Sequence, residues 1–189
     1  MIKIGDFNVL KISRESDNGL YLDVNDEEEV LLPNKYVPDE YEIGQELNVF
    51  ICYDSEDRPM ATTEIPYAKV GDFAILKVVG VDKVGAFLDW GLPKDLFLPY
   101  REQSRELEEG HEVLVHVYLD NTNRIAASMR IEKYLDKSKN PYKEGEVVDL
   151  LIIGKTDLGY KAVINGKHLG LLYAGEVFQG HRPVWDSDA

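Results

Sequence analysis

The stretch Gly85-Ala86-Phe87-Leu88-Asp89 decides the fold, because a close copy occurs 66 residues earlier as Gly19-Leu20-Tyr21-Leu22-Asp23. Four further landmarks keep this spacing: Gly5-Asp6-Phe7 with Gly71-Asp72-Phe73, Leu32-Pro33 with Leu98-Pro99, Gly44 with Gly110, and Arg58 to Thr62 with Arg124 to Ser128. Five matches at one spacing are hard to obtain by chance. The sequence therefore contains a tandem repeat.

A third copy follows the second at a spacing of 74 residues, with Gly145-Glu146-Val147 and Gly159-Tyr160 as its landmarks. Its register is lost after about Phe178, and its last strand would lie beyond Ala189. We therefore expect three tandem units, over residues 1–63, 64–135 and 136–189, with the third incomplete and continued by a divergent tail or cut short.

Each unit has the pattern of a small all-β domain. In the second unit, runs of β-branched, aromatic and alternating residues predict strands over 72–79, 86–90, 96–98, 113–118 and 124–128. Five short strands in about 65 residues fit a five-stranded Greek-key barrel of the OB type. A glycine at the start of the second strand suits the close backbone approach of strongly coiled strands. One helix is predicted, over 129–135, before a polar linker at 136–141.

The second unit resembles the RNA-binding barrel of ribosomal protein S-one type. The resemblance lies in Gly85 to Gly91, followed by Asp95-Leu96-Phe97-Leu98-Pro99. Three such barrels in one short chain resemble the conserved virulence factor B family, whose members carry the barrels followed by a winged-helix domain. The resemblance covers residues 1 to about 178, so the chain looks like a family member truncated before that domain.

This resemblance implies RNA binding through aromatic and basic residues on the exposed face of strands two and three. The positions that match the family's Phe are Tyr21, Phe87 and Lys161, and those that match its His are Pro33, Pro99 and Tyr173. Proline neither donates a hydrogen bond nor offers a flat π-face. The first two barrels are therefore expected to keep the fold and to bind RNA less firmly.

An RNA site needs an exposed ring beside a cation, since bases stack on aromatic faces while cations track the phosphates. With the register taken from the family, Lys77 is predicted on the outer face of its strand beside Phe87, and the repeat gives Lys11 with Tyr21. In the alternative interpretation, Phe87 packs under a neighbouring barrel and Lys77 is a solvated edge charge.

The last unit has the best mixture of basic and aromatic residues, and its candidates are Tyr160, Lys161, Lys167 and Tyr173. We expect RNA on the face shared by the second and third units, with Tyr160 or Tyr173 stacking and Lys161 and Lys167 holding phosphates. Alternatively, Tyr160 fills the barrel and the lysines only confer solubility.

The net charge of −14 argues against general attraction to polyanions, so any nucleic-acid site must be a local patch. The three units carry net charges of −10, −3 and −1 in order, so the first barrel is the least expected to meet phosphate. The acidic run Asp26 to Glu29 is interpreted as a solvated hairpin tip. A second hypothesis follows, a protein-interaction scaffold in which the acidic first barrel docks a basic partner.

No catalytic constellation is found. Gly154-Lys155-Thr156 resembles the end of a phosphate-binding loop, but Asp149 stands where that loop needs glycine. His111 and His116 are five residues apart on one predicted strand and so face opposite sides, unsuited to a shared metal. Cys52 lies in an apolar run and is expected to be buried and inert. We expect a non-enzymatic protein without cofactor or metal.

Location and assembly are further expectations. The longest apolar runs are far shorter than the ~20 residues needed to cross a bilayer, and the first residues do not resemble a signal peptide, so a bacterial cytoplasmic protein without membrane contact is expected. An unclosed third barrel would leave open strand edges, which favour self-association.

Overall fold

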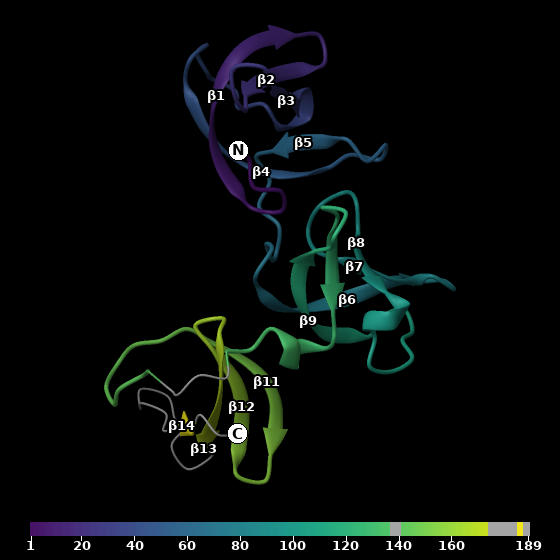
Figure 1. Ribbon diagram of the computed structural model, residues 1–189, viewed down its shortest axis with the longest axis vertical. Helices are drawn as coiled ribbons and strands as arrows, with labels where there is room; N and C mark the ends of the chain where they lie inside the picture. Colours follow the sequence, from purple (N-terminus) through teal and green to yellow (C-terminus); the bar gives the residue numbers. More distant parts are fainter. Residues whose placement is uncertain (137–140, 174–184, 187–189) are drawn as a thin grey trace.

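The structure, a computed structural model, describes residues 1–136, 141–173 and 185–186. Three β units follow one another along the longest axis of the molecule, from β1 (Phe7–Ser16) at one end to β13 (His168–Tyr173) at the other (Figure 1). This order along the axis is the order of the repeats in the sequence.

The first unit is a closed five-stranded barrel. Beyond β1, its strands are β2 (Gly19–Asp23), β3 (Glu29–Pro33), β4 (Glu46–Tyr53) and β5 (Pro59–Thr62), with the 3₁₀ turn η1 (Asn34–Tyr36) after β3. Antiparallel pairs join β1 to β2 and β4, and a short parallel pair between β3 and β5, at Leu31 and Met60, closes the barrel.

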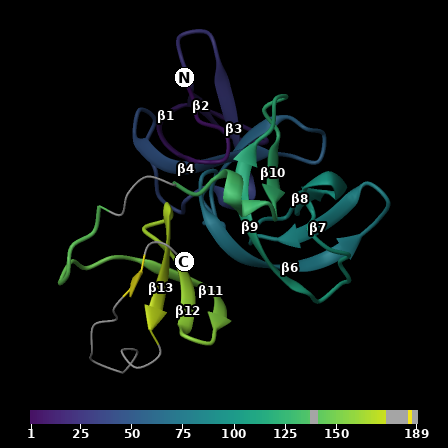
Figure 2. The same ribbon diagram turned by 60° about the horizontal axis from the view of Figure 1, so that its bottom comes forward.

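The second unit repeats this barrel strand for strand (Figure 2). Its elements are β6 (Phe73–Val81), β7 (Gly85–Asp89), β8 (Leu96–Pro99), the 3₁₀ turn η2 (Tyr100–Glu102), β9 (Glu112–Leu119) and β10 (Ile125–Ser128). The closing parallel pair again joins the third and fifth strands, at Phe97 and Ala126. The predicted fold is therefore confirmed for both units.

The third unit is a four-stranded sheet in the order β11 (Leu150–Thr156), β12 (Gly159–Ile164), β13 and β14 (Trp185–Asp186). Its first three strands repeat those of the barrels. The sequence also predicted an open strand edge in this unit, where the closing strand of the barrel is missing. That closing strand would lie outside the described residues, so the open edge stays a prediction. The helix predicted over 129–135 is wrong in extent, because only the single 3₁₀ turn η3 (Ile131–Lys133) forms there.

Two features that recur in the repeats allow the strands to bend strongly enough to close a barrel. The first strand of every unit carries a bulge at the same place in the repeat, between Ile12 and Arg14 in β1 and between Val78 and Gly80 in β6. Gly85 also lies against the third strand, where an added Cβ would be 2.4 Å from the carbonyl oxygen of Leu98. Only glycine permits this approach, as the sequence predicted.

The core of each barrel is formed by the inward-facing residues of its strands. Leu22, Leu32 and Ile51 are fully buried in the first barrel, as are Leu88 and Leu98 in the second. Alternate residues of the same strands face outward. The outer faces are therefore what distinguishes one barrel from the next.

The outer face of β9 is covered by the segment that leads to the third unit. His116 is buried between the rings of Phe73 and Tyr134, with centroids 4.6 Å and 4.0 Å away. Its Nδ1 has no hydrogen-bond partner in the described residues. Burial lowers the pKa of His116 to about 4, although nearby Asp72 acts in the opposite direction.

We predict that His116→Phe removes a pH-dependent loss of stability from the second barrel. Phe50 occupies the equivalent position of the first barrel, so an apolar ring suits the site. His116 has a lower pKa folded than unfolded, so its neutral form stabilises the protein near neutral pH, and that contribution is lost as the pH falls from about 6.5 towards 4. At about pH 5 the loss is about 2 kcal/mol.

The measurement is urea unfolding of the wild type and the variant at pH 7 and about pH 5. The difference in free energy of unfolding between the two proteins should shift in favour of the variant by about 2 kcal/mol at the lower pH. An unchanged difference would show that His116 is not held neutral.

Candidate nucleic-acid interface

An aromatic pair lies on the outer face of the second barrel. Phe87 of β7 and Phe97 of β8 are directly opposed across the two strands, and their ring centroids are 5.5 Å apart. Both alternate with inward-facing leucines, so the pleat directs the two rings outward, and both are half-buried. The two rings are tilted by 37° to each other, and each offers an apolar face of the kind on which a base stacks.

The first barrel has the same position, but its ring is covered. The guanidinium of Arg14 lies 3.9 Å from the centroid of Tyr21, and Glu29 accepts a hydrogen bond from it at 3.1 Å. In the second barrel the residue equivalent to Arg14 is Gly80, which is opposite Phe87. No side chain at position 80 covers the ring of Phe87, so the stacking position is closed in the first barrel and more open in the second.

The aromatic pair faces a groove between the first two barrels, with a volume of about 1270 Å³. The first barrel contributes residues around η1 and the β4–β5 turn, and the second contributes β7, β8, η2 and the start of β10. Its aromatic lining consists of Tyr36, Tyr53, Phe87, Trp90, Phe97, Tyr100 and Tyr118. The groove is thus mostly apolar, with rings from both barrels.

Packing of the two barrels against each other creates this groove. Phe50 of β4 points outward from the first barrel, and Trp90, which follows β7, packs edge-on against it with ring centroids 5.7 Å apart. Phe50, Trp90 and neighbouring Cys52 are all buried in one core that includes the interior of the second barrel. The junction is therefore an extension of a hydrophobic core.

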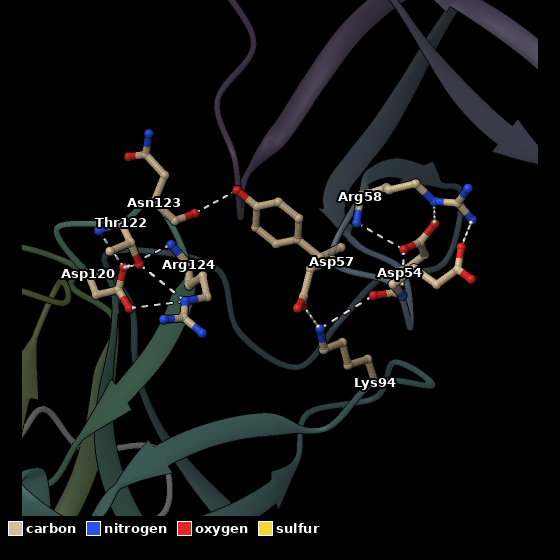
Figure 3. Close-up of polar contacts among 10 residues, drawn as sticks. Asp54, Asp57, Arg58, Lys94, Asp120, Thr122, Asn123 and Arg124 are labelled. Carbon is tan, nitrogen blue, oxygen red and sulfur yellow. Dashed lines mark hydrogen bonds and ion pairs between the residues drawn. The ribbon is translucent and has the colours of Figure 1, made fainter.

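Polar contacts close the junction at the rim of the groove. The hydroxyl of Tyr53 donates a hydrogen bond of 2.6 Å to the carbonyl oxygen of Asn123. Lys94 reaches from the second barrel to the carboxylate of Asp57 at 2.5 Å and to the carbonyl oxygen of Asp54 at 3.4 Å (Figure 3). The hydrogen bond from Lys94 lowers the pKa of Asp57.

Most charges in the groove are paired within the protein. Asp120 lies 3.9 Å from Arg124, and hydrogen bonds from Thr122 and Arg124 lower the pKa of its carboxyl against the opposing effect of burial. By contrast, burial and the nearby charge of Asp89 raise the pKa of Asp95. Two cations are less firmly held. Arg101 is 77% exposed and makes a 4.0 Å contact with Glu102, a carboxylate that Lys133 also contacts at 2.9 Å, and Lys35 lies 5.0 Å above the ring of Tyr36. The groove can therefore supply stacking surfaces and a small number of phosphate contacts.

The structure does not place Lys77 directly opposite Phe87. Lys77 lies on the outer face of β6 and is exposed, but it is opposite Asp89, and Phe87 is opposite Gly80. The register of the pair decides this, because Lys77 is opposite the residue two positions after Phe87 with or without the bulge at Val79. Lys11 likewise pairs with Glu46, and the cation beside Tyr21 is Arg14.

The structure does not bring the third-unit candidates together. Tyr160 and Lys161 are consecutive in β12 and so face opposite sides of the sheet. Lys161 is opposite Leu171, which places it on the same face as Tyr173, two residues further along β13. Lys167 lies in the turn at the other end of this hairpin. Lys161 and Tyr173 are the two candidates that share a face.

The sequence interpretation missed Phe97, Lys35 and Arg101. Phe97 was detectable, because the repeat that predicted strands two and three also places it opposite Phe87. Lys35 and Arg101 line the groove only because one barrel packs on the other. No local sequence pattern predicts that packing.

The sequence profile of the S1 domain matches this chain twice, over residues 4–64 and 70–130. These ranges are the two closed barrels and together cover more than half of the chain.

Curated relatives are similar over larger parts of the chain. Conserved virulence factor B of Staphylococcus epidermidis strain RP62A is 26% identical over 180 residues, which are 86% of this chain and 60% of the relative. Conserved virulence factor B of Staphylococcus saprophyticus is 25% identical over 143 residues, which are 67% of this chain and 48% of the relative. The chain spans about half the length of the curated relatives it matches.

A solved structure shares the fold. It is a multidomain protein with nucleic acid binding domains from Streptococcus pneumoniae, and it superposes with a TM-score of 0.58 at 18% identity. The match covers 93% of this chain and 64% of the other. The order of barrels along the chain is thus found in a second protein.

The described residues contain no group of three His, Cys, Asp or Glu side chains placed to hold a metal ion. Over the same residues, no helix is long and apolar enough to cross a membrane.

We predict that Cys52 is unreactive while the two barrels stay packed. The thiol is buried at the junction, and burial raises its pKa to about 12, so little thiolate forms at pH 8. A colorimetric disulfide reagent at pH 8 should react with the native protein far more slowly than with the urea-unfolded protein. Equal rates would show that the junction opens readily.

Proposed function

The chain belongs to the S1 domain family, and from this premise we propose that it binds single-stranded RNA in the groove between its first two barrels. The observation that carries the proposal is the outward-facing pair Phe87 and Phe97 at the wall of that groove. Aromatic side chains hold RNA when its bases are unstacked and free to lie on a ring. Such bases occur in single strands, loops and ends rather than in duplexes.

The charge distribution supports binding dominated by stacking. Lys35 and Arg101 give the groove about two cations for phosphates. Lys94 and Arg124 are engaged by Asp57 and Asp120, whereas Arg101 shares the carboxylate of Glu102 with Lys133, which is the nearer cation at 2.9 Å. A site that neutralises about two phosphates has a log–log salt slope of about −1.4 on single strands. Affinity then depends mainly on base stacking, which suits a chain with a net charge of −14.

The proposal extends to the cellular role. The chain acts as a non-enzymatic regulator of gene expression in the bacterial cytoplasm, where single-stranded RNA is its partner. The first barrel has a separate part, because Arg14 covers Tyr21 and the exposed acidic turn from Asp26 to Glu28 follows β2. This barrel is suited to a basic protein partner, which is the second candidate function.

We predict that Phe87→Ala weakens binding of a labelled 12-nucleotide oligouridylate by roughly fivefold to 150-fold, because loss of one stacking ring costs about 1–3 kcal/mol. Fluorescence anisotropy at low salt measures the dissociation constant. The matched control is Tyr21→Ala, which removes the equivalent ring from the first barrel, where Arg14 already covers it, and should change affinity little. No RNA binding at about 50 µM wild-type protein in low salt would refute the proposal.

We also predict that Gly80→Arg weakens RNA binding although it adds a positive charge. An added Cβ at Gly80 would meet Phe87 at 3.8 Å, an ordinary contact, so the larger residue fits, and its guanidinium can cover Phe87 as Arg14 covers Tyr21. Gly154→Arg is the control, because it adds the same charge at the equivalent position of the third unit, away from the groove. Stronger binding by Gly80→Arg than by the wild type would mean that charge, rather than stacking, decides affinity.

A further inference from the structure

We infer that the first two barrels bind one RNA strand together, in a single continuous site that crosses their junction. This inference rests on the proposed function and adds that one ligand contacts both barrels at once. It differs from a site confined to the strand face of one barrel, because residues of both barrels must be in place for a long strand to bind.

The junction fixes the orientation of the two barrels. Phe50 is fully buried and Trp90 is 3% exposed, and Ala68 of the connecting segment is buried in the same core. The connection itself is hydrogen-bonded, since the backbone N–H of Val70 donates to the carbonyl oxygen of Gly5 at 2.8 Å. A core that is shared by two domains does not let them rotate freely. The groove therefore keeps its shape before any ligand binds.

Corresponding turns of the two barrels meet at the rim. In each barrel, the turn between the fourth and fifth strands begins at an aspartate, Asp54 in the first barrel and Asp120 in the second. Its carboxylate accepts hydrogen bonds from the backbone N–H groups two and four residues later. In these turns Asp57 and Asn123 have positive φ angles of 60° and 62°. The carboxylate of Asp57 accepts a hydrogen bond from Lys94, and the backbone carbonyl of Asn123 accepts one from Tyr53. The repeated turn therefore supplies an acceptor on each side of the junction (Figure 3).

The two barrels contribute different groups to the groove. The second barrel provides stacking rings at Phe87 and Phe97, and the first barrel provides a cation at Lys35. Its volume of about 1270 Å³ exceeds the roughly 300–1,000 Å³ of pockets that hold a drug-sized molecule, which favours an extended ligand. An unpaired strand suits both contributions, with bases on the rings of the second barrel and the backbone passing Lys35 of the first.

The acidic residues that line the groove do not prevent RNA from binding there. Asp57 and Asp120 are each held by a cation of the second barrel, and Asp54 accepts a hydrogen bond from Arg58 at 2.9 Å. Asp95 remains as a carboxylate lining the groove, and its pKa is raised. The pairing of most carboxylates reduces the repulsion of phosphate in an otherwise acidic barrel.

Strand length and one charge reversal test the inference. Oligouridylates of 4 and 12 nucleotides are titrated by anisotropy against the full chain, because a single OB barrel binds from about 4 nucleotides. Lys35→Glu should weaken the 12-mer at least roughly threefold, reduce the magnitude of its salt slope by about 0.7, and leave the 4-mer unchanged. Lys11→Glu makes the same charge change on an exposed strand residue of the same barrel outside the groove, and should affect neither length.

The outcomes separate the inference from the proposed function. If Phe87→Ala weakens both lengths while Lys35→Glu and Lys11→Glu are indistinguishable on the 12-mer, RNA binds one barrel alone and the continuous site is wrong. If Phe87→Ala changes neither length, the proposed function itself is wrong. Lys35→Ala, with a thermal melt of each variant, shows whether any loss by Lys35→Glu comes from damage to the contact with Tyr36.

Discussion

The contact between Trp90 and Phe50 is the interaction on which the groove depends. Phe50 points out of a barrel that is already closed, so alone it would expose a large apolar ring to water. Covering that ring with Trp90 joins the outer face of one barrel to the core of the next. The groove beside this contact is the consequence, because two convex barrels in contact along one face leave a hollow along the edge of that face.

The repeat does not continue this arrangement into the third unit, and one residue explains why. His116 takes the place of Phe50 in the second barrel, and the ring that covers it is Tyr134, which comes from the barrel's own following segment. The equivalent of Tyr134 in the first repeat is Ala68, whose small side chain leaves room for the incoming Trp90. A bulky residue at this one position therefore closes the docking face, and a small one leaves it open for the next barrel.

The sequence predicted the barrels well, because their determinants are local. The alternation of apolar and polar residues predicted the strands. The glycine at the start of each second strand predicted a close backbone approach, which the structure shows at Gly85. The site was less predictable. The register of the β6–β7 pair sets Lys77 opposite Asp89, and the pleat places Tyr160 and Lys161 on opposite faces. The cations of the groove come from segments that meet only when one barrel packs on another, so spacing in the sequence could not reveal them.

An acidic protein can bind a polyanion only if the binding surface is locally neutral, and this groove reaches that condition through pairing. Lys94 and Arg124 form ion pairs with carboxylates. Their positive charges therefore neutralise those carboxylates and do not attract phosphate from a distance. Long-range attraction is therefore weak, and non-specific binding to any nucleic acid is disfavoured. A ligand is then selected by its ability to place unstacked bases against Phe87 and Phe97. A duplex keeps its bases stacked and is repelled along the whole acidic surface, whereas a single strand is repelled less and can stack on the rings. Within the proposed function, the acidity of the chain therefore favours an unpaired strand over a duplex.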